Sequence, residues 1–116
     1  ACQGAIAITA RATDTRMIDA LNKCIDRNAW LEVAAEREFL DVLDGSCRTA
    51  IGALARIDGS RLRFIGEVLS PDGSRCWRRS ETIELEEDAF AQAVALGDKL
   101  GGEIADEAGD ALVPDA

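Results

Sequence analysis

The stretch that decides the fold is AIGALARIDGSRLRFIGEVLSPDGSRCWRRSETI, residues 50–83. It contains three runs with the apolar and polar alternation of half-buried strands, and we expect strands over about 50–57, 61–69 and 74–83. Asp58-Gly59 separates the first two runs and Ser70-Pro71-Asp72-Gly73 the last two, and both are turn sequences. Because two tight turns join consecutive strands, the sequence predicts a three-stranded antiparallel meander.

Helical patterns flank this meander on both sides. We expect helices over about 14–25, 29–44 and 87–108, each with apolar residues at helical spacing. The last one contains Gly97, Gly101 and Gly102, which favour a break, but its apolar spacing continues through them. We therefore expect one uninterrupted helix whose glycines allow it to lie close to the sheet or to a neighbouring helix. The pattern predicts an α+β fold with the helices packed on one face of the sheet.

Length and composition are typical of one small globular domain. The chain has 116 residues, 47% hydrophobic and 30% charged, and no apolar run approaches the roughly 18–20 residues that span a bilayer. The net charge is −9, and residues 81–116 contain 11 acidic side chains against one basic one, Lys99. Such an acidic surface repels phosphates and anionic lipids, so we expect neither nucleic acid nor a membrane as a partner.

Four cysteines and no histidine limit the chemistry that the chain can perform. Cys2, Cys24, Cys47 and Cys76 are scattered without a Cys-x-x-Cys pair, so we expect no metal site and no Cys-His or Ser-His-Asp nucleophile. Scattered cysteines are typical of reduced thiols in the cytoplasm. We interpret Cys2, Cys24 and Cys76 as small buried apolar residues. Cys47 differs, because it follows Gly45 on a turn between a helix and a strand, where a thiol is held in place and still reachable.

Four short blocks along the chain form a further pattern. They are Gln3-Gly4-Ala5-Ile6-Ala7-Ile8, Ala35-Glu36-Arg37, the segment from Leu43 through Gly45 and Cys47 to Ile51-Gly52, and Asp72-Gly73. In order and spacing they resemble the C-terminal third of the porphobilinogen deaminase (hydroxymethylbilane synthase) family. One departure is Ala50, where the family usually has proline. The resemblance implies that residues 1–11 are the last strand of the family's first domain and that residues 12–116 are its third, cofactor-tethering domain.

The resemblance also implies an activity. Enzymes of this family are transferases that condense four porphobilinogen molecules into hydroxymethylbilane with release of ammonia, in tetrapyrrole and haem synthesis. The growing product is attached to a dipyrromethane cofactor, which a thioether joins to the loop cysteine, here Cys47. A sulfur nucleophile suits the soft electrophile that porphobilinogen becomes when it loses ammonia. Gln3 matches a family position beside the active-site cleft, and Gly45 and Gly52 would set the backbone geometry around the loop.

The family's catalytic residues are expected outside this chain. The arginines that bind the carboxylates of porphobilinogen, and an aspartate that assists at the pyrrole nitrogens, lie in the first and second domains of the family. We therefore expect that the chain alone neither turns over porphobilinogen nor retains the cofactor. The strand at 3–10 would lack its partners and be disordered, displaced or paired with another copy. We interpret Arg37 as an ion-pair residue rather than an anion clamp.

A second interpretation follows from the residues without the resemblance. The chain would then be a free-standing α+β binding or redox-sensing module in which Cys47 is an exposed loop thiol. The abrupt start of the sequence at a strand favours a fragment of a longer enzyme. In both cases we expect Cys47 to be accessible to thiol reagents and Cys24 to be largely buried.

Overall fold

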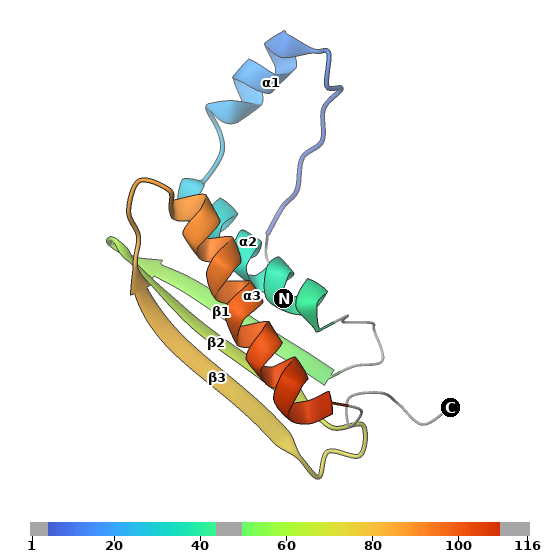
Figure 1. Cartoon of the computed structure of the whole chain (residues 1–116). Helices are drawn as coiled ribbons and strands as arrows, with labels where there is room; N and C mark the ends of the chain where they lie inside the picture. The colour runs from blue at the N-terminus through green and yellow to red at the C-terminus, as the bar shows by residue number, and fades with distance from the viewer. Residues whose placement is uncertain (1–4, 44–49, 110–116) are drawn as a thin grey trace.

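The computed structural model describes residues 5–43 and 50–109. Its elements in chain order are α1 (Thr15–Asn22), α2 (Arg27–Val42), β1 (Ala50–Asp58), β2 (Arg61–Leu69), β3 (Cys76–Glu84) and α3 (Ala89–Ala108). The strands form one antiparallel sheet in the order β1-β2-β3, and α2 and α3 lie side by side across one face of it (Figure 1). The α+β meander that the sequence predicts is confirmed, with strand ends within two residues of those expected.

Capping side chains determine where the first two helices begin. The carboxylate of Asp14 accepts a hydrogen bond from the backbone N–H of Met17 at 3.0 Å, and that of Asp26 accepts one from Ala29 at 3.1 Å. Because Asp26 caps α2, the helix begins at Arg27, two residues before the predicted start. It ends at Val42, and α1 ends at Asn22, three residues before its predicted end.

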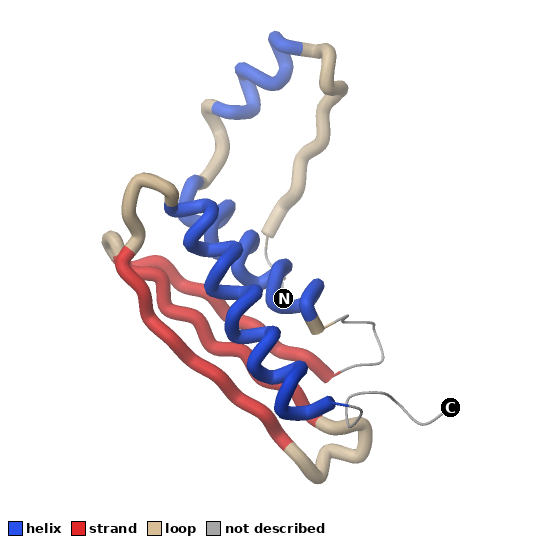
Figure 2. The backbone as a smooth tube through the Cα atoms, in the orientation of Figure 1, coloured by secondary structure: helices blue, strands red, loops and turns tan. Residues whose placement is uncertain are grey.

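The N-terminal arm, residues 5–25, does not pack onto the sheet. Figure 1 shows α1 and the segment before it projecting away from the sheet and the other helices, and no residue of α1 is buried. Residues 5–10 form no strand, and Ile6 and Ile8 are 90% and 65% exposed. The expected packing of helices on one face therefore applies to α2 and α3 only. The physical reason is that α2 and α3 already lie across that face of the sheet (Figure 2).

The core lies between the sheet and the α2–α3 pair, and Phe39 of α2 is at its centre. The Phe39 side chain is fully buried, and its ring centroid lies 5.2 Å from that of Phe64 on β2. The ring occupies the space over Gly66, where an added Cβ would collide with three ring atoms of Phe39. Because β2 is the central strand, the alternating residues Leu62, Phe64 and Val68 are also fully buried. Gly66 thus makes room for one of the largest fully buried side chains of the core.

Helix α3 is continuous through its glycines, as the spacing predicts, and these glycines bring it close to α2. A Cβ at Gly97 would collide with the backbone oxygen of Ala35, and one at Gly101 would lie 3.2 Å from that of Phe39. A Cβ at Gly102 would meet no atom within 4 Å. The neighbour that α3 approaches is therefore α2, and two of the three glycines are required for it.

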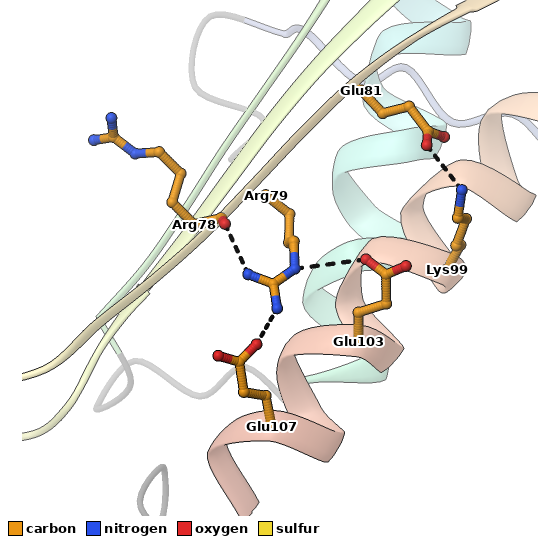
Figure 3. Close-up of polar contacts among 6 residues, drawn as sticks. All are labelled: Arg78, Arg79, Glu81, Lys99, Glu103 and Glu107. Atoms are coloured by element: carbon orange, nitrogen blue, oxygen red, sulfur yellow. Dashed lines mark hydrogen bonds and ion pairs between the residues drawn. The ribbon is translucent and has the colours of Figure 1, made fainter.

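Ion pairs connect α3 to β3, the edge strand farthest from β1 (Figure 3). The guanidinium of Arg79 on β3 contacts Glu107 and lies 3.6 Å from Glu103, both on α3. Lys99 of α3 donates to Glu81 of β3 at 2.8 Å. Since these groups are half-exposed or exposed, we assign them a modest stabilising role. None of the described helices is long and apolar enough to cross a membrane.

Two side chains bind backbone oxygens of β3. Arg79 donates to the carbonyl of Arg78 at 3.0 Å, and the amide of Gln92 donates to the carbonyl of Glu84 at 3.0 Å. Both carbonyls belong to even-numbered residues of the strand, whose backbone groups point away from β2. The outer edge of β3 is thus partly satisfied by its own domain.

We expect opposite effects from alanine at two glycines of α3. Gly97→Ala should lower the free energy of unfolding by about 1–3 kcal/mol, because the new methyl group overlaps rigid backbone of α2. Gly102→Ala should raise it by about 0.5–1 kcal/mol, because alanine restricts the unfolded chain and meets no atom in the folded one. Urea unfolding followed by circular dichroism measures both. Equal stability of Gly97→Ala and the unchanged chain would contradict the close helix contact.

Candidate functional site

Gly45 and Cys47, which the sequence singles out, belong to the connection between α2 and β1, and Gly52 follows it in β1. Cys47 and Gly45, and Gln3 near the N-terminus, lie outside the described residues. The structure describes the two ends of the connection, which are Leu43 after α2 and Ala50 at the start of β1. These two ends, with the elements that position them, form the frame on either side of residues 44–49.

The helix end of this frame is fixed by the core. Leu43 is 7% exposed and belongs to the core cluster, and its backbone N–H donates to the carbonyl of Phe39 at 3.3 Å. On the strand side, Ala50 is opposite Leu69, which is opposite Cys76. Gly52 has open space where a Cβ would be, so the described surroundings give no steric reason for glycine at this position.

Two glutamates of α2 bind the free edge of β1. The Oε2 atom of Glu32 accepts from the backbone N–H of Ile57 at 2.8 Å, and the Oε2 atom of Glu36 accepts from that of Ala55 at 3.4 Å. Glu36 is 8% exposed. Edge strands carry unpaired backbone groups, and here carboxylates satisfy two of them. The contacts join α2 to β1 directly, beside the core contacts of Phe39.

The turn between β2 and β3 lies at the same end of the sheet as Ala50. Its centre is Asp72, whose carboxylate accepts from the Ser70 hydroxyl at 2.7 Å and from the backbone N–H and hydroxyl of Ser74 at 3.0 and 2.8 Å. These hydrogen bonds, led by the one from the backbone of Ser74, lower the pKa of Asp72 to about 2. Gly73 follows with φ of 75°, which glycine adopts without strain. The Asp72-Gly73 block is therefore a rigid turn.

The uncovered face of the sheet is shallowly hollowed next to Ala50. The hollow has a volume of about 470 Å³, and its lining includes Ala50, Gly52, Leu54, Ile65, Glu67 and Leu69. Leu54 and Ile65 are 48% and 39% exposed. The hollow is mainly apolar, and it contains no grouping of residues suited to catalysis.

The expectation that Cys24 and Cys76 are buried is wrong. Both are exposed, because Cys24 follows the projecting helix α1 and Cys76 begins β3 on the uncovered face of the sheet. The Cys76 thiol lies 3.4 Å from Oε1 of Glu67. Partial loss of hydration, together with that carboxylate, raises the pKa of Cys76. Cys76 is therefore a weak nucleophile near neutral pH.

Charged groups of the described residues do not form a binding site for a metal or a polycarboxylate near Ala50. No group of three His, Cys, Asp or Glu side chains suited to a metal ion occurs in the ranges 5–43 and 50–109. The nearby arginines are engaged, since Arg78 pairs with Glu67 and Arg75 lies 4.7 Å over the ring of Trp77. Arg37 is exposed and forms no ion pair within those same ranges, so an ion pair of Arg37 with another domain stays a prediction.

Comparisons with known proteins agree on one family. The family model described as "Porphobilinogen deaminase, C-terminal domain" matches residues 30–106. Curated proteins named "Porphobilinogen deaminase" are similar over most of the chain. That of Caulobacter vibrioides is 46% identical over 114 residues, which are 96% of this chain and 34% of the relative. That of Nitrobacter hamburgensis is 43% identical over 109 residues, 93% of this chain and 33% of the relative. The chain spans about a third of the length of the curated relatives it matches.

We expect the contribution of Asp72 to stability to disappear in acid. A carboxyl group whose pKa is lowered on folding stabilises the fold above its unfolded pKa, near 4, and loses this effect as pH falls toward its folded pKa of about 2. The difference in unfolding free energy between the unchanged chain and Asp72→Asn should therefore shrink from pH 6 to pH 2. Urea titrations at both pH values measure it, and an equal difference at the two would refute the proposed hydrogen-bonded carboxylate.

We also expect Cys76 to react slowly with iodoacetamide at pH 8, because its raised pKa leaves little thiolate. Glu67→Gln should accelerate alkylation of Cys76, since it removes the acceptor charge beside the sulfur and leaves Arg78 nearby. Peptide mapping by mass spectrometry reports each cysteine separately, and Cys24 is the internal control. A slower or unchanged rate at Cys76 in Glu67→Gln would contradict the assignment.

Proposed function

This chain belongs to the porphobilinogen deaminase family as its C-terminal domain, and we propose that it tethers the dipyrromethane cofactor of the complete enzyme through Cys47. In this proposal the complete enzyme is a transferase that joins four porphobilinogen molecules into hydroxymethylbilane with release of ammonia, a step of tetrapyrrole and haem synthesis. The scattered cysteines support an enzyme of the cytoplasm with reduced thiols. Nucleic acid and membranes are not among its proposed partners.

The observation that carries the proposal is the frame around residues 44–49. A helix end buried in the core and a strand start held by the sheet border a six-residue connection that contains Cys47. Attachment of a reactive group requires a fixed position, because misplacement by about 1 Å is enough to slow a reaction strongly. Rigid elements on both sides of the connection are what such an attachment needs.

The described residues fit a role in holding the cofactor and not in recognising its carboxylates. When bound, the dipyrromethane supplies the primer to which pyrrole units are added. Cys47 would hold it by a thioether, Gly45 and Gly52 would shape the connection, and Gln3 would contact the cofactor or substrate at the cleft. Among the described residues, Arg78 and Arg75 at the same end of the sheet as Ala50 are already engaged by Glu67 and Trp77. Carboxylate recognition is therefore assigned to the preceding domains of the enzyme, where porphobilinogen would bind.

The N-terminal arm supports this division. Residues 1–11 are proposed to be the last strand of the preceding first domain, and residues 12–116 the tethering domain. The described part of that strand carries Ile6 and Ile8, whose side chains are exposed and would find an apolar partner in the first domain. In the separate chain the same residues could pair with another copy.

The test is covalent loading of the complete enzyme. Cys47→Ser should abolish the cofactor adduct in the intact mass and nearly abolish porphobilinogen consumption, because a hydroxyl is a far poorer soft nucleophile than a thiol at neutral pH. Cys76→Ser is the matched control, since it changes an exposed thiol that lies 29 residues further along the chain than Cys47. It should load and consume porphobilinogen normally.

The 116-residue chain alone should neither carry the adduct nor consume porphobilinogen, because a thiol without the preceding domains offers capture without orientation. Normal loading of Cys47→Ser would mean that the anchor is assigned to the wrong residue. Loss of loading in Cys76→Ser alone would move the anchor to β3. Steady consumption of porphobilinogen by the 116-residue chain would overturn the proposal that this domain attaches the cofactor while the preceding domains bind the substrate.

A further inference from the structure

We propose that Glu32 and Glu36 are positioning residues for Cys47, because their carboxylates lock α2 and β1 in one register and so fix the two ends of the connection that carries the cysteine. The inference rests on the proposed function of Cys47 as the anchor. It gives Glu32 and Glu36 a role that acts through the helix and the strand that they join.

The hydrogen bonds Glu32–Ile57 and Glu36–Ala55 are successive steps along α2 and β1, and we call this pair of contacts the ladder. Glu32 and Glu36 are four residues apart on α2, a rise of about 6 Å. Their partners Ile57 and Ala55 are two residues apart on β1, a rise of about 6.6–6.8 Å. The intervals nearly match, so both carboxylates can bind at once with the helix and the strand running in opposite directions.

Because α2 and β1 run in opposite directions along the ladder, the end of α2 lies beside the start of β1. The residue number falls along β1 from Ile57 to Ala55 while it rises along α2 from Glu32 to Glu36. Each further step takes four residues of α2 and two residues of β1. Two more steps therefore bring the end of α2, near Leu43, level with Ile51 of β1. Residues 44–49 then connect two ends that the ladder has already aligned.

A shift of β1 by one such step, two residues, relative to α2 would displace one end of the connection that contains Cys47. It would move Ala50 by about 6.6–6.8 Å relative to the end of α2. Reacting atoms must approach to about 3–3.5 Å, so an attachment point displaced by this amount would not serve the reaction. Packing of Phe39 over Gly66 fixes α2 against the central strand β2, and the two carboxylates add a direct, directional link between α2 and the edge strand β1, which leads to the connection.

The residue type at position 36 supports a directional role. Glu36 is 8% exposed, in a position between the apolar residues Ala35 and Phe39 of the core face. Burial of a leucine at this position would cost less free energy than burial of a glutamate, because a carboxylate loses favourable hydration when it leaves water. What leucine cannot do is accept the N–H of Ala55. Charged acceptors make the stronger hydrogen bonds, which favours the locked register over its neighbours.

The first measurement is amide hydrogen exchange in the 116-residue chain, followed by NMR. Glu36→Leu should raise the exchange rate of the Ala55 amide by about tenfold or more, the loss expected for a hydrogen bond to a charged acceptor. Glu32→Leu should do the same for Ile57. Glu36→Gln keeps an acceptor oxygen and should restore much of the protection. Glu103→Leu, which removes an ion-pair partner of Arg79 on α3, is the control and should leave both amides unchanged.

The second measurement is cofactor loading of the complete enzyme by intact mass. Glu32→Leu combined with Glu36→Leu should lower the loaded fraction several-fold, whereas Glu32→Gln combined with Glu36→Gln, and Glu103→Leu, should load normally. Glu32→Leu alone gives the same test at a partly buried position if the double leucine variant does not fold, and it should lower loading to a smaller extent.

Two outcomes would overturn the inference. One is unchanged exchange of Ala55 and Ile57 in the leucine variants, and the other is full loading despite accelerated exchange. Failure of the proposed function gives a different result, because Cys47→Ser would then load normally whatever the glutamate variants do. A drop in loading that Glu103→Leu shares would identify a general loss of stability and would also overturn the positioning role.

Discussion

The contact on which the structure depends is the packing of Phe39 between three elements. Its ring occupies the space that a side chain at Gly66 would need on β2. On the other side, the backbone of α2 at Ala35 and Phe39 lies close to Gly97 and Gly101 of α3. Side chains larger than hydrogen at Gly97 and Gly101 would push α3 away from α2.

Helix α2 links this packing to the candidate site. α2 carries Phe39 in the core, Glu32 and Glu36 toward the edge of β1, and Leu43 at the last turn before residues 44–49. The same element thus supplies the core, the contact with the strand edge and the start of the connection that contains Cys47. The stability of the core and the position of the start of this connection therefore depend on the same helix.

The elements with local signals could be predicted from the sequence. Alternation and turn residues defined the three strands, and the apolar spacing across Gly97 and Gly101 identified α3 as one helix. The exposure of Cys24 and Cys76 could not be predicted, because it depends on where α1 projects and which face of the sheet is uncovered. The bonds of Glu32 and Glu36 join residues 25 and 19 positions apart and leave no local pattern. Cys47 was identified through family resemblance, since composition and spacing alone indicate only a reachable thiol.

The side chains that meet the two outer strands of the sheet have a consequence for the chain in a crowded cell. On β1, carboxylates accept the outward N–H groups of Ala55 and Ile57, and on β3, Arg79 and Gln92 donate to the outward carbonyls of Arg78 and Glu84. A foreign strand would have to displace an acceptor on one side and a donor on the other before it could extend the sheet. Amyloid-like growth by edge addition is thereby opposed at the parts of both edges where these side chains bind.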